Sequence, residues 1–233
     1  MNSTAQKVFA YGGPVCALAF GAGLFLMGFV PPPRPSLSPE EIAAIYRQDY
    51  PAIRVGVMIS LFGLSAWAAY VGVISTQLLR IKGVSRLGAL THLGAGSAGV
   101  LTVLIPLMLI GICAYRPERD PVLIQTLNDA VWLSFMMPFS TFLTQFTAFA
   151  VAVLGDKSPA PVFPRWTAYV CLWAGLQFAA GGFALFFKTG PFAWNNLFPF
   201  WLGGGAFFLW LVVLTPCVLR AIDQEKNQAA EQL

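Results

Sequence analysis

Charged residues are scarce in this sequence. Aspartate, glutamate, lysine and arginine make up 10% of its 233 residues, against about 25% in a typical soluble domain. Hydrophobic residues make up 57%, so the chain lacks the polar surface that a water-soluble fold of this size needs. We therefore predict a polytopic membrane protein. The net charge of +4 is spread over short loops, which does not indicate nucleic-acid binding.

Residues that bind metals and cofactors are scarce too. His92 is the only histidine, whereas a membrane haem needs a second strong axial ligand and di-iron enzymes need clusters of histidine and glutamate. Every lysine lies in a loop or at the end of an apolar segment, which argues against a retinal Schiff base. Four cysteines lack C-x-x-C spacing and are interpreted as small core residues: Cys16, Cys113, Cys171 and Cys217. The sequence thus predicts no metal, no cofactor and no catalytic residue, although it leaves enzymatic activity open.

Long apolar segments are what the sequence does contain. Six of them have the length and the lack of charge that are typical of transmembrane helices. They are Val8–Val30, Val55–Leu79, Leu87–Ala114, Ala130–Leu154, Thr167–Phe187 and Leu197–Leu219. The first is too long for a signal peptide and no A-x-A site follows it, so we expect it to be retained. We predict an all-α bundle of six transmembrane helices that forms one domain over residues 1–233.

Lysines and arginines suggest an orientation for this bundle. With the N-terminus in the cytoplasm, eight of the 14 fall on the inner side and six on the outer side. The short turn from Arg80 to Arg86 holds three of the inner ones, and short loops weigh most in the positive-inside rule. We therefore predict that both termini are cytoplasmic, in a multi-pass protein of a bacterial inner membrane.

The first outer loop carries a helix-start signal. Ser38 can cap a helix, Pro39 suits its first position, and Glu41 can complete a capping box. We predict a short amphipathic helix over residues 39–48, ending before Pro51. It either plugs the end of the bundle or forms a lid over a ligand site.

Uncharged polar residues inside the apolar segments are candidates for ligand contact. On the fourth segment, Ser134, Pro138, Thr141 and Gln145 recur at helical spacing, so they share one stripe of a continuous helix. Gln145 and Gln177 lie at similar depth on consecutive antiparallel helices, near the bilayer midplane. They either bond to each other and hold the two helices together or line a polar patch in a cavity.

His92 shares a helix face with several glycines. It is either a neutral contact between helices or part of a proton relay or ligand site.

Charged and amide side chains gather at the outer ends of the helices. The predicted cluster consists of Arg54, Arg116, Arg119, Asp120, Asn128, Asp129 and Lys188. One interpretation is a salt-bridge network that ties the loops together, and the other is an entrance that attracts an amphipathic acid or a headgroup. No pair of carboxylates has a spacing typical of acid–base catalysis.

Four motifs together resemble a known family. They are Tyr115-Arg-Pro-Glu-Arg-Asp-Pro, Leu127-Asn-Asp-Ala-Val-Trp, Pro161-Val-Phe-Pro-Arg-Trp and Phe187-Lys-Thr-Gly-Pro-Phe-Ala-Trp-Asn. They resemble uncharacterised six-helix integral membrane proteins of actinobacteria and proteobacteria, often encoded near genes for steroid or aromatic catabolism. The resemblance covers nearly the whole chain and assigns no role to any residue, but it implies a hydrophobic ligand by association.

These observations lead to one hypothesis and two alternatives. The chain binds or transports a lipophilic small molecule, which contacts Trp132 and Trp194 and meets Gln145 and Gln177 at mid-depth. Its expected partners are membrane lipids, such a ligand, and a second copy or a membrane complex. In the first alternative the chain is an accessory subunit that packs through its Gly181-Gly and Gly203-Gly-Gly faces. In the second it is a membrane enzyme that uses the outer carboxylates of Asp120 or Asp129.

Overall fold

The computed structural model describes residues 3–82 and 86–231. In this part of the chain, six helical stretches are long and apolar enough to cross a membrane. They are Ser3–Leu26, Pro39–Leu78, Arg86–Tyr115, Pro121–Gly155, Trp166–Phe186 and Leu197–Ala230. The predicted bundle of six transmembrane helices is thereby confirmed. The turn expected between Arg80 and Arg86 includes residues 83–85, which lie outside the described residues.

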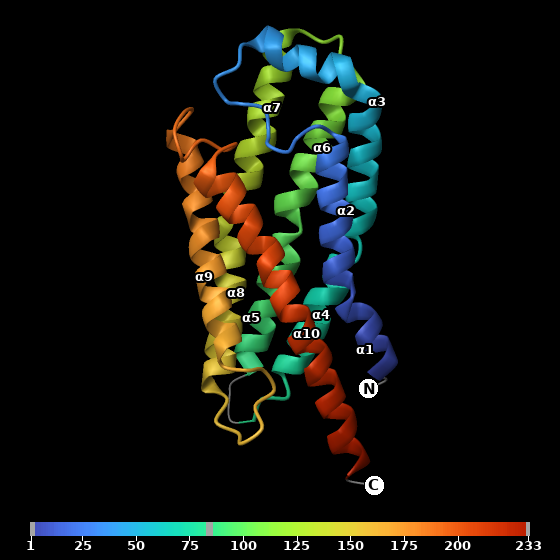
Figure 1. The fold of residues 1–233 in the computed structure, drawn as a ribbon, viewed down its shortest axis with the longest axis vertical. Helices are drawn as coiled ribbons and strands as arrows, with labels where there is room; N and C mark the ends of the chain where they lie inside the picture. Colours follow the sequence, from blue (N-terminus) through green and yellow to red (C-terminus); the bar gives the residue numbers. More distant parts are fainter. Residues whose placement is uncertain (1–2, 83–85, 232–233) are drawn as a thin grey trace.

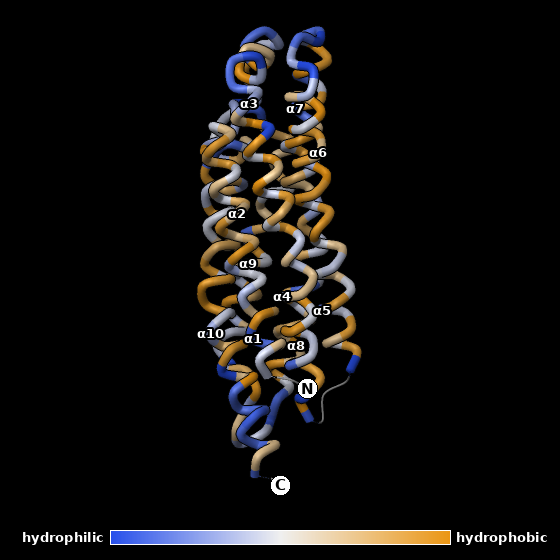
Figure 2. The backbone as a smooth tube through the Cα atoms, turned by 90° about the vertical axis from the view of Figure 1, so that its right-hand side faces the viewer, coloured by the Kyte–Doolittle hydropathy of each residue, from blue (hydrophilic) through white to orange (hydrophobic). Residues whose placement is uncertain are grey.

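The bundle is elongated, and both chain ends lie at the same end of it (Figure 1). We call this the termini end. The opposite end, which carries the start of the second span and the loop before the fourth, is called the loop end. Hydrophilic residues concentrate at both ends, and apolar residues dominate between them (Figure 2). This distribution matches the water and hydrocarbon layers of a bilayer and implies contact with membrane lipids.

Four of the six spans consist of two helices each. The first consists of α1 (Ser3–Ala10) and α2 (Gly12–Leu26), and the second of α3 (Pro39–Leu64) and α4 (Trp67–Leu78). The third consists of α5 (Arg86–Gly99) and α6 (Leu101–Tyr115), and the fourth of α7 (Pro121–Met136) and α8 (Phe139–Gly155). In the fifth span α9 (Trp166–Gly181) continues as the 3₁₀ helix η1 (Gly182–Phe186). In the sixth a π-helical turn η2 (Leu197–Leu202) precedes α10 (Gly203–Ala230).

The break in the fourth span changes the predicted polar stripe. Pro138 separates α7 from α8 and has φ −79° and ψ 41°, outside the helical range. Proline has no N–H to donate to the carbonyl of the preceding turn, and its ring clashes there, which explains the break. Ser134 therefore lies on α7 and Gln145 on α8. The prediction that both belong to one stripe of a continuous helix is wrong.

The start of α3 shows the predicted capping box. The Ser38 N–H donates to the Glu41 carboxylate at 2.7 Å, and the Glu41 N–H donates to the Ser38 hydroxyl at 3.3 Å. The helix does not end before Pro51, however. It kinks at Asp49, with φ −120° and ψ 20°, and continues into the second span. Proline removes one backbone hydrogen bond here, but the apolar helix that follows packs against the bundle and keeps the two parts joined.

A polar network joins three helices at the termini end. Gln6 on α1 and Gln77 on α4 both donate to the Glu225 carboxylate on α10, at 2.9 and 3.0 Å. Nearby, the Lys7 ammonium lies 2.6 Å from the Asp223 carboxylate. The first and last helices of the chain are thus held together.

The loop between α8 and α9 is organised by one carboxylate. Asp156 is buried, and its two oxygens accept hydrogen bonds from the Ser158 N–H and hydroxyl and from the Val162 N–H. Burial alone would raise the pKa of Asp156, but these hydrogen bonds together hold it below its usual value. The carboxylate therefore stabilises the loop in its charged form.

We expect acid to loosen this loop. The stabilisation is fully present above the pKa that Asp156 has in the unfolded chain, about 4, and is lost as the pH falls through the lower folded pKa. Protease cleavage within residues 157–165 should accelerate over that range in the wild-type protein. Asp156→Asn should be cleaved rapidly at every pH, whereas Asp49→Asn, in the kink of α3, should behave like the wild type. A pH-independent cleavage rate in the wild type would contradict this role.

Candidate functional site

An apolar cavity lies among the helices in the half of the bundle nearer the loop end. Its volume is about 390 Å³. Its wall comes from α2 and the segment after it, α6, the α7–α8 pair, α9, η2 and α10. The lining residues are Phe20, Gly21, Leu24, Phe25, Val30, Thr102, Val103, Phe135, Met136, Phe142, Phe178, Gly181, Pro199, Phe200, Trp201, Gly203, Gly204, Gly205, Phe207 and Phe208. We call this the main cavity.

The main cavity opens toward the membrane between α2 and η2. Phe25 at the end of α2 is 79% exposed, and Trp201 in η2 is 51% exposed. Deeper in the wall, Phe142 is buried and Phe178 half-buried, and their rings stack with centroids 4.8 Å apart. The wall of the main cavity is thus exposed at this edge and aromatic in its interior.

Glycines create much of the space in the main cavity. A Cβ atom built at Gly204 or Gly205 would meet no other atom within 4 Å. Gly181 on α9 lines the same space. The two glycine clusters that the sequence suggests as packing surfaces for a partner thus both contribute to this cavity.

All seven residues proposed from the sequence as ligand contacts lie in the described part of the chain, and none lines the main cavity. Trp132 is buried and donates to Oδ1 of Asn128 at 3.2 Å, and Trp194 is buried and donates to the Pro33 carbonyl at 2.8 Å. Ser134 and Thr141 donate to backbone carbonyls of their own chain segment, at 3.1 and 3.0 Å. The remaining three are His92, Gln145 and Gln177.

His92 and Gln145 form a buried polar core with Ser75. Nδ1 of His92 lies 2.9 Å from the Ser75 hydroxyl, and Nε2 lies 3.3 Å from the Gln145 amide nitrogen. Because that amide nitrogen can only donate, Nε2 accepts and Nδ1 donates to Ser75. Oε1 of Gln145 is buried without a partner. This arrangement joins α4, α5 and α8.

The structure pairs Gln145 with His92 instead of with Gln177. A Cβ at Gly96 would lie 2.8 Å from Nε2 of Gln145, so this glycine leaves the room that the amide occupies. Gln177 lies half-buried on α9. Two amides at equal depth therefore do not face each other, because side-chain direction around each helix decides the contact as much as depth does.

Three arginines of the loop end donate to backbone carbonyl groups. Arg54 donates to the Ala114 and Tyr115 carbonyls, each at 3.0 Å, and Arg119 donates to the Ile112 carbonyl at 2.7 Å. Arg47, which was not part of the predicted cluster, donates to the Pro117 and Arg119 carbonyls. These bonds satisfy carbonyls at and beyond the end of α6, where helical partners run out.

The other members of the predicted cluster have separate surroundings. Asp120 caps α7 by accepting from the Val122 N–H at 2.9 Å, while Arg116 lies 5.9 Å from the ring centroid of its neighbour Tyr115. Asn128 is buried and accepts from Tyr46 and Trp132. Among the described residues, no ion pair joins the members of this cluster, which include the partly buried Asp129 and the exposed Lys188. The described residues thus show no salt-bridge network among these side chains.

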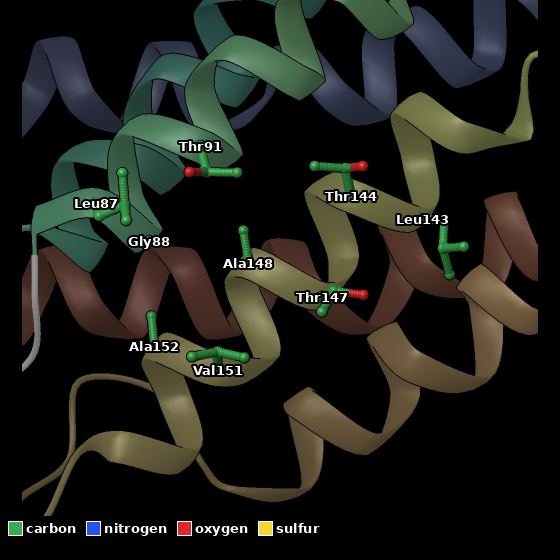
Figure 3. A pocket seen from close by; sticks show the side chains of 9 residues that line it. All are labelled: Leu87, Gly88, Thr91, Leu143, Thr144, Thr147, Ala148, Val151 and Ala152. Carbon is green, nitrogen blue, oxygen red and sulfur yellow. The ribbon is translucent and has the colours of Figure 1, made fainter.

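A second, shallower depression lies on the lipid-facing side between α5 and α8 (Figure 3). Its volume is about 430 Å³. Gly88 and Ala152 both line it, and a Cβ at Gly88 would lie 3.4 Å from the Cβ of Ala152, so the helices meet closely there. Figure 3 shows Thr91, Thr144 and Thr147 along its sides. The groove is broad and open, and it is less enclosed than the main cavity.

Among the residues that the structure describes, no group of three histidine, cysteine, aspartate or glutamate side chains could hold a metal ion. Comparisons with protein-family models, with curated proteins and with solved structures find no match to this chain.

Proposed function

We propose that this multi-pass membrane protein binds an uncharged lipophilic small molecule in the main cavity. The observation that carries the proposal is a cavity of about 390 Å³ with apolar walls and a mouth toward the bilayer. Sites for small molecules typically measure about 300–1,000 Å³ and are lined mainly by hydrophobic and aromatic side chains. The ligand enters between Phe25 and Trp201, from lipid.

The wall of the main cavity selects against charge. It contains no charged side chain, and the Thr102 hydroxyl already donates to the Gly99 carbonyl at 2.8 Å. A charged group in such surroundings would lose its hydration without gaining a partner, which costs several kcal/mol or more. The ligand class is therefore a neutral hydrocarbon-like molecule, or the hydrocarbon part of a larger one.

The proposal includes an orientation. Lysines and arginines in short loops at the termini end support placing both termini in the cytoplasm of a bacterium. The mouth of the main cavity then opens to the outer half of the inner membrane.

Filling the cavity from Gly204 tests the proposal. We expect Gly204→Leu to reduce the co-purifying ligand by at least about tenfold, because displacing two methylene groups from an apolar site costs about 1.6 kcal/mol. The measurement is mass spectrometry of apolar molecules extracted from protein purified from its native membrane. The matched control is Gly94→Leu on α5, where a Cβ also meets no atom within 4 Å but which faces lipid away from the cavity. Equal amounts of the same molecules with both variants would count against the proposal.

A further inference from the structure

Two small voids adjoin the main cavity. Each has a volume of about 10 Å³. One lies against Trp67 and is called the Trp67 void, and the other lies against Trp132 and is called the Trp132 void. Both share Phe20 and Val103 with the wall of the main cavity. The three spaces are therefore neighbours separated by single side chains.

Each void ends at a tryptophan that is fixed in place. The indole N–H of Trp67 donates to the Gly96 carbonyl at 2.9 Å, and that of Trp132 donates to Oδ1 of Asn128 at 3.2 Å. Both rings are 2% exposed. A buried indole that would lose its hydrogen bond by moving makes a rigid back wall.

A half-buried phenylalanine in the wall of the main cavity packs against each tryptophan. Phe207 lines the main cavity and the Trp67 void, and its ring stacks on Trp67 with centroids 5.7 Å apart. Phe135 lines the main cavity and the Trp132 void, and its ring meets Trp132 edge-on at 6.4 Å. Both phenylalanines are only half-buried, and a phenyl ring has no hydrogen bond to hold it. Each ring therefore forms part of the wall between the main cavity and the tryptophan behind it.

We propose that Phe207 and Phe135 are specificity-determining residues that limit how far an apolar ligand extends into the bundle. This inference rests on the proposed function, since it assigns a ligand-length limit to the same cavity. Shortening either side chain joins the main cavity to one void and lets a longer hydrocarbon chain reach the tryptophan behind it. Each additional methylene group that becomes buried should tighten binding about fourfold.

A series of alkyl photoprobes tests the length limit. The full-length protein, reconstituted in phospholipid nanodiscs, is exposed to n-alkanols of increasing chain length that carry a terminal diazirine. Adducts on residues of the main cavity are then quantified by peptide mass spectrometry. Variants and wild type are compared at the same probe chain length and in the same lipid, so that differences in how probes partition into the membrane cancel. The variants are Phe207→Ala, Phe135→Ala and Phe207→Trp, and the control is Phe62→Ala, which removes a 74% exposed ring on α3 that lines none of the three spaces.

The proposal predicts a chain length above which wild-type labelling falls. Phe207→Ala and Phe135→Ala should move this limit upward by two or three carbons, and labelling just above the wild-type limit should rise at least tenfold. Phe207→Trp should move the limit downward, which keeps the test valid if an alanine variant does not fold. Phe62→Ala should leave the limit unchanged. If the cavity is labelled with the same chain-length limit in every variant, the role of Phe207 and Phe135 is overturned but the proposed function stands. If the wild-type cavity is not labelled at all, the proposed function itself is overturned.

Discussion

Gly56→Leu should prevent the bundle from assembling, because α2 and α3 touch through their backbones at this position. A Cβ atom at Gly56 would lie 2.6 Å from the Gly23 carbonyl oxygen, and one at Gly23 would lie 2.6 Å from the Gly56 carbonyl oxygen. Real Cβ atoms do not approach backbone atoms so closely, and a backbone cannot move aside as a side chain can. We expect a loss of at least about 3 kcal/mol, the upper range for overpacking.

The measurement is the yield of monodisperse protein in mild detergent, together with its thermal unfolding midpoint. Gly72→Leu is the matched control, since Gly72 lies on α4 in the same span and a Cβ there meets no atom within 4 Å. It should purify like the wild type. Equal yields and equal midpoints for the two variants would show that α2 and α3 do not pack as the structure has them.

His92→Leu and Gln145→Leu should both destabilise the protein, and their effects should not add. The first leaves the Ser75 hydroxyl and the Gln145 amide without partners, at about 1–3 kcal/mol for a buried group. The second should cost less, because it also removes the unpartnered Oε1 of Gln145. The double variant removes both ends of the bond, so its cost should fall short of the sum by about 1 kcal/mol.

A double-mutant cycle on the free energy of unfolding in detergent measures this coupling. Gln177→Leu serves as the control, because Gln177 is half-buried on α9 and pairs with neither residue. It should change the free energy of unfolding by no more than about 0.5 kcal/mol and add to His92→Leu. Additive effects of His92→Leu and Gln145→Leu would contradict the buried pair.

The six spans could be predicted because they depend on the length and polarity of single segments. The capping box at Ser38 could be predicted because it depends on a short local motif. Those features depend on residues close together in the chain. Pro138 lies within a long apolar segment, so the sequence suggested that it belongs to the polar stripe of one continuous helix. In the structure it separates α7 from α8 instead. A proline in such a run can kink or end a helix, and only the packing around it decides which.

The partners of polar side chains could not be predicted, because they depend on which helices become neighbours and on the direction of each side chain around its helix. Depth along the helix axis suggested Gln177 for Gln145. In the bundle α8 packs against both α9 and α5, and the Gln145 side chain meets His92 on α5. The arginines of the loop end follow the same rule, since their partners are carbonyl groups at the end of α6. Any sequence has such carbonyls, so no pattern of side chains signals this contact.

The main cavity was even harder to predict from the sequence. Its wall takes a few residues from each of several helices, and most of them are phenylalanine or glycine. Such residues are typical of any membrane helix. The abundance of aromatic residues was consistent with an apolar pocket, but the Gly203–Gly205 run suggested a surface for a partner and not the opening of a cavity.

The most direct test of the central claim is a density map of the protein purified from its native membrane. The wild-type map should show continuous density inside the main cavity, from the mouth beside Trp201 inward to Phe207, and the Gly204→Leu map should lack it. Side chains that close the cavity in both maps, with no density between them, would contradict the account.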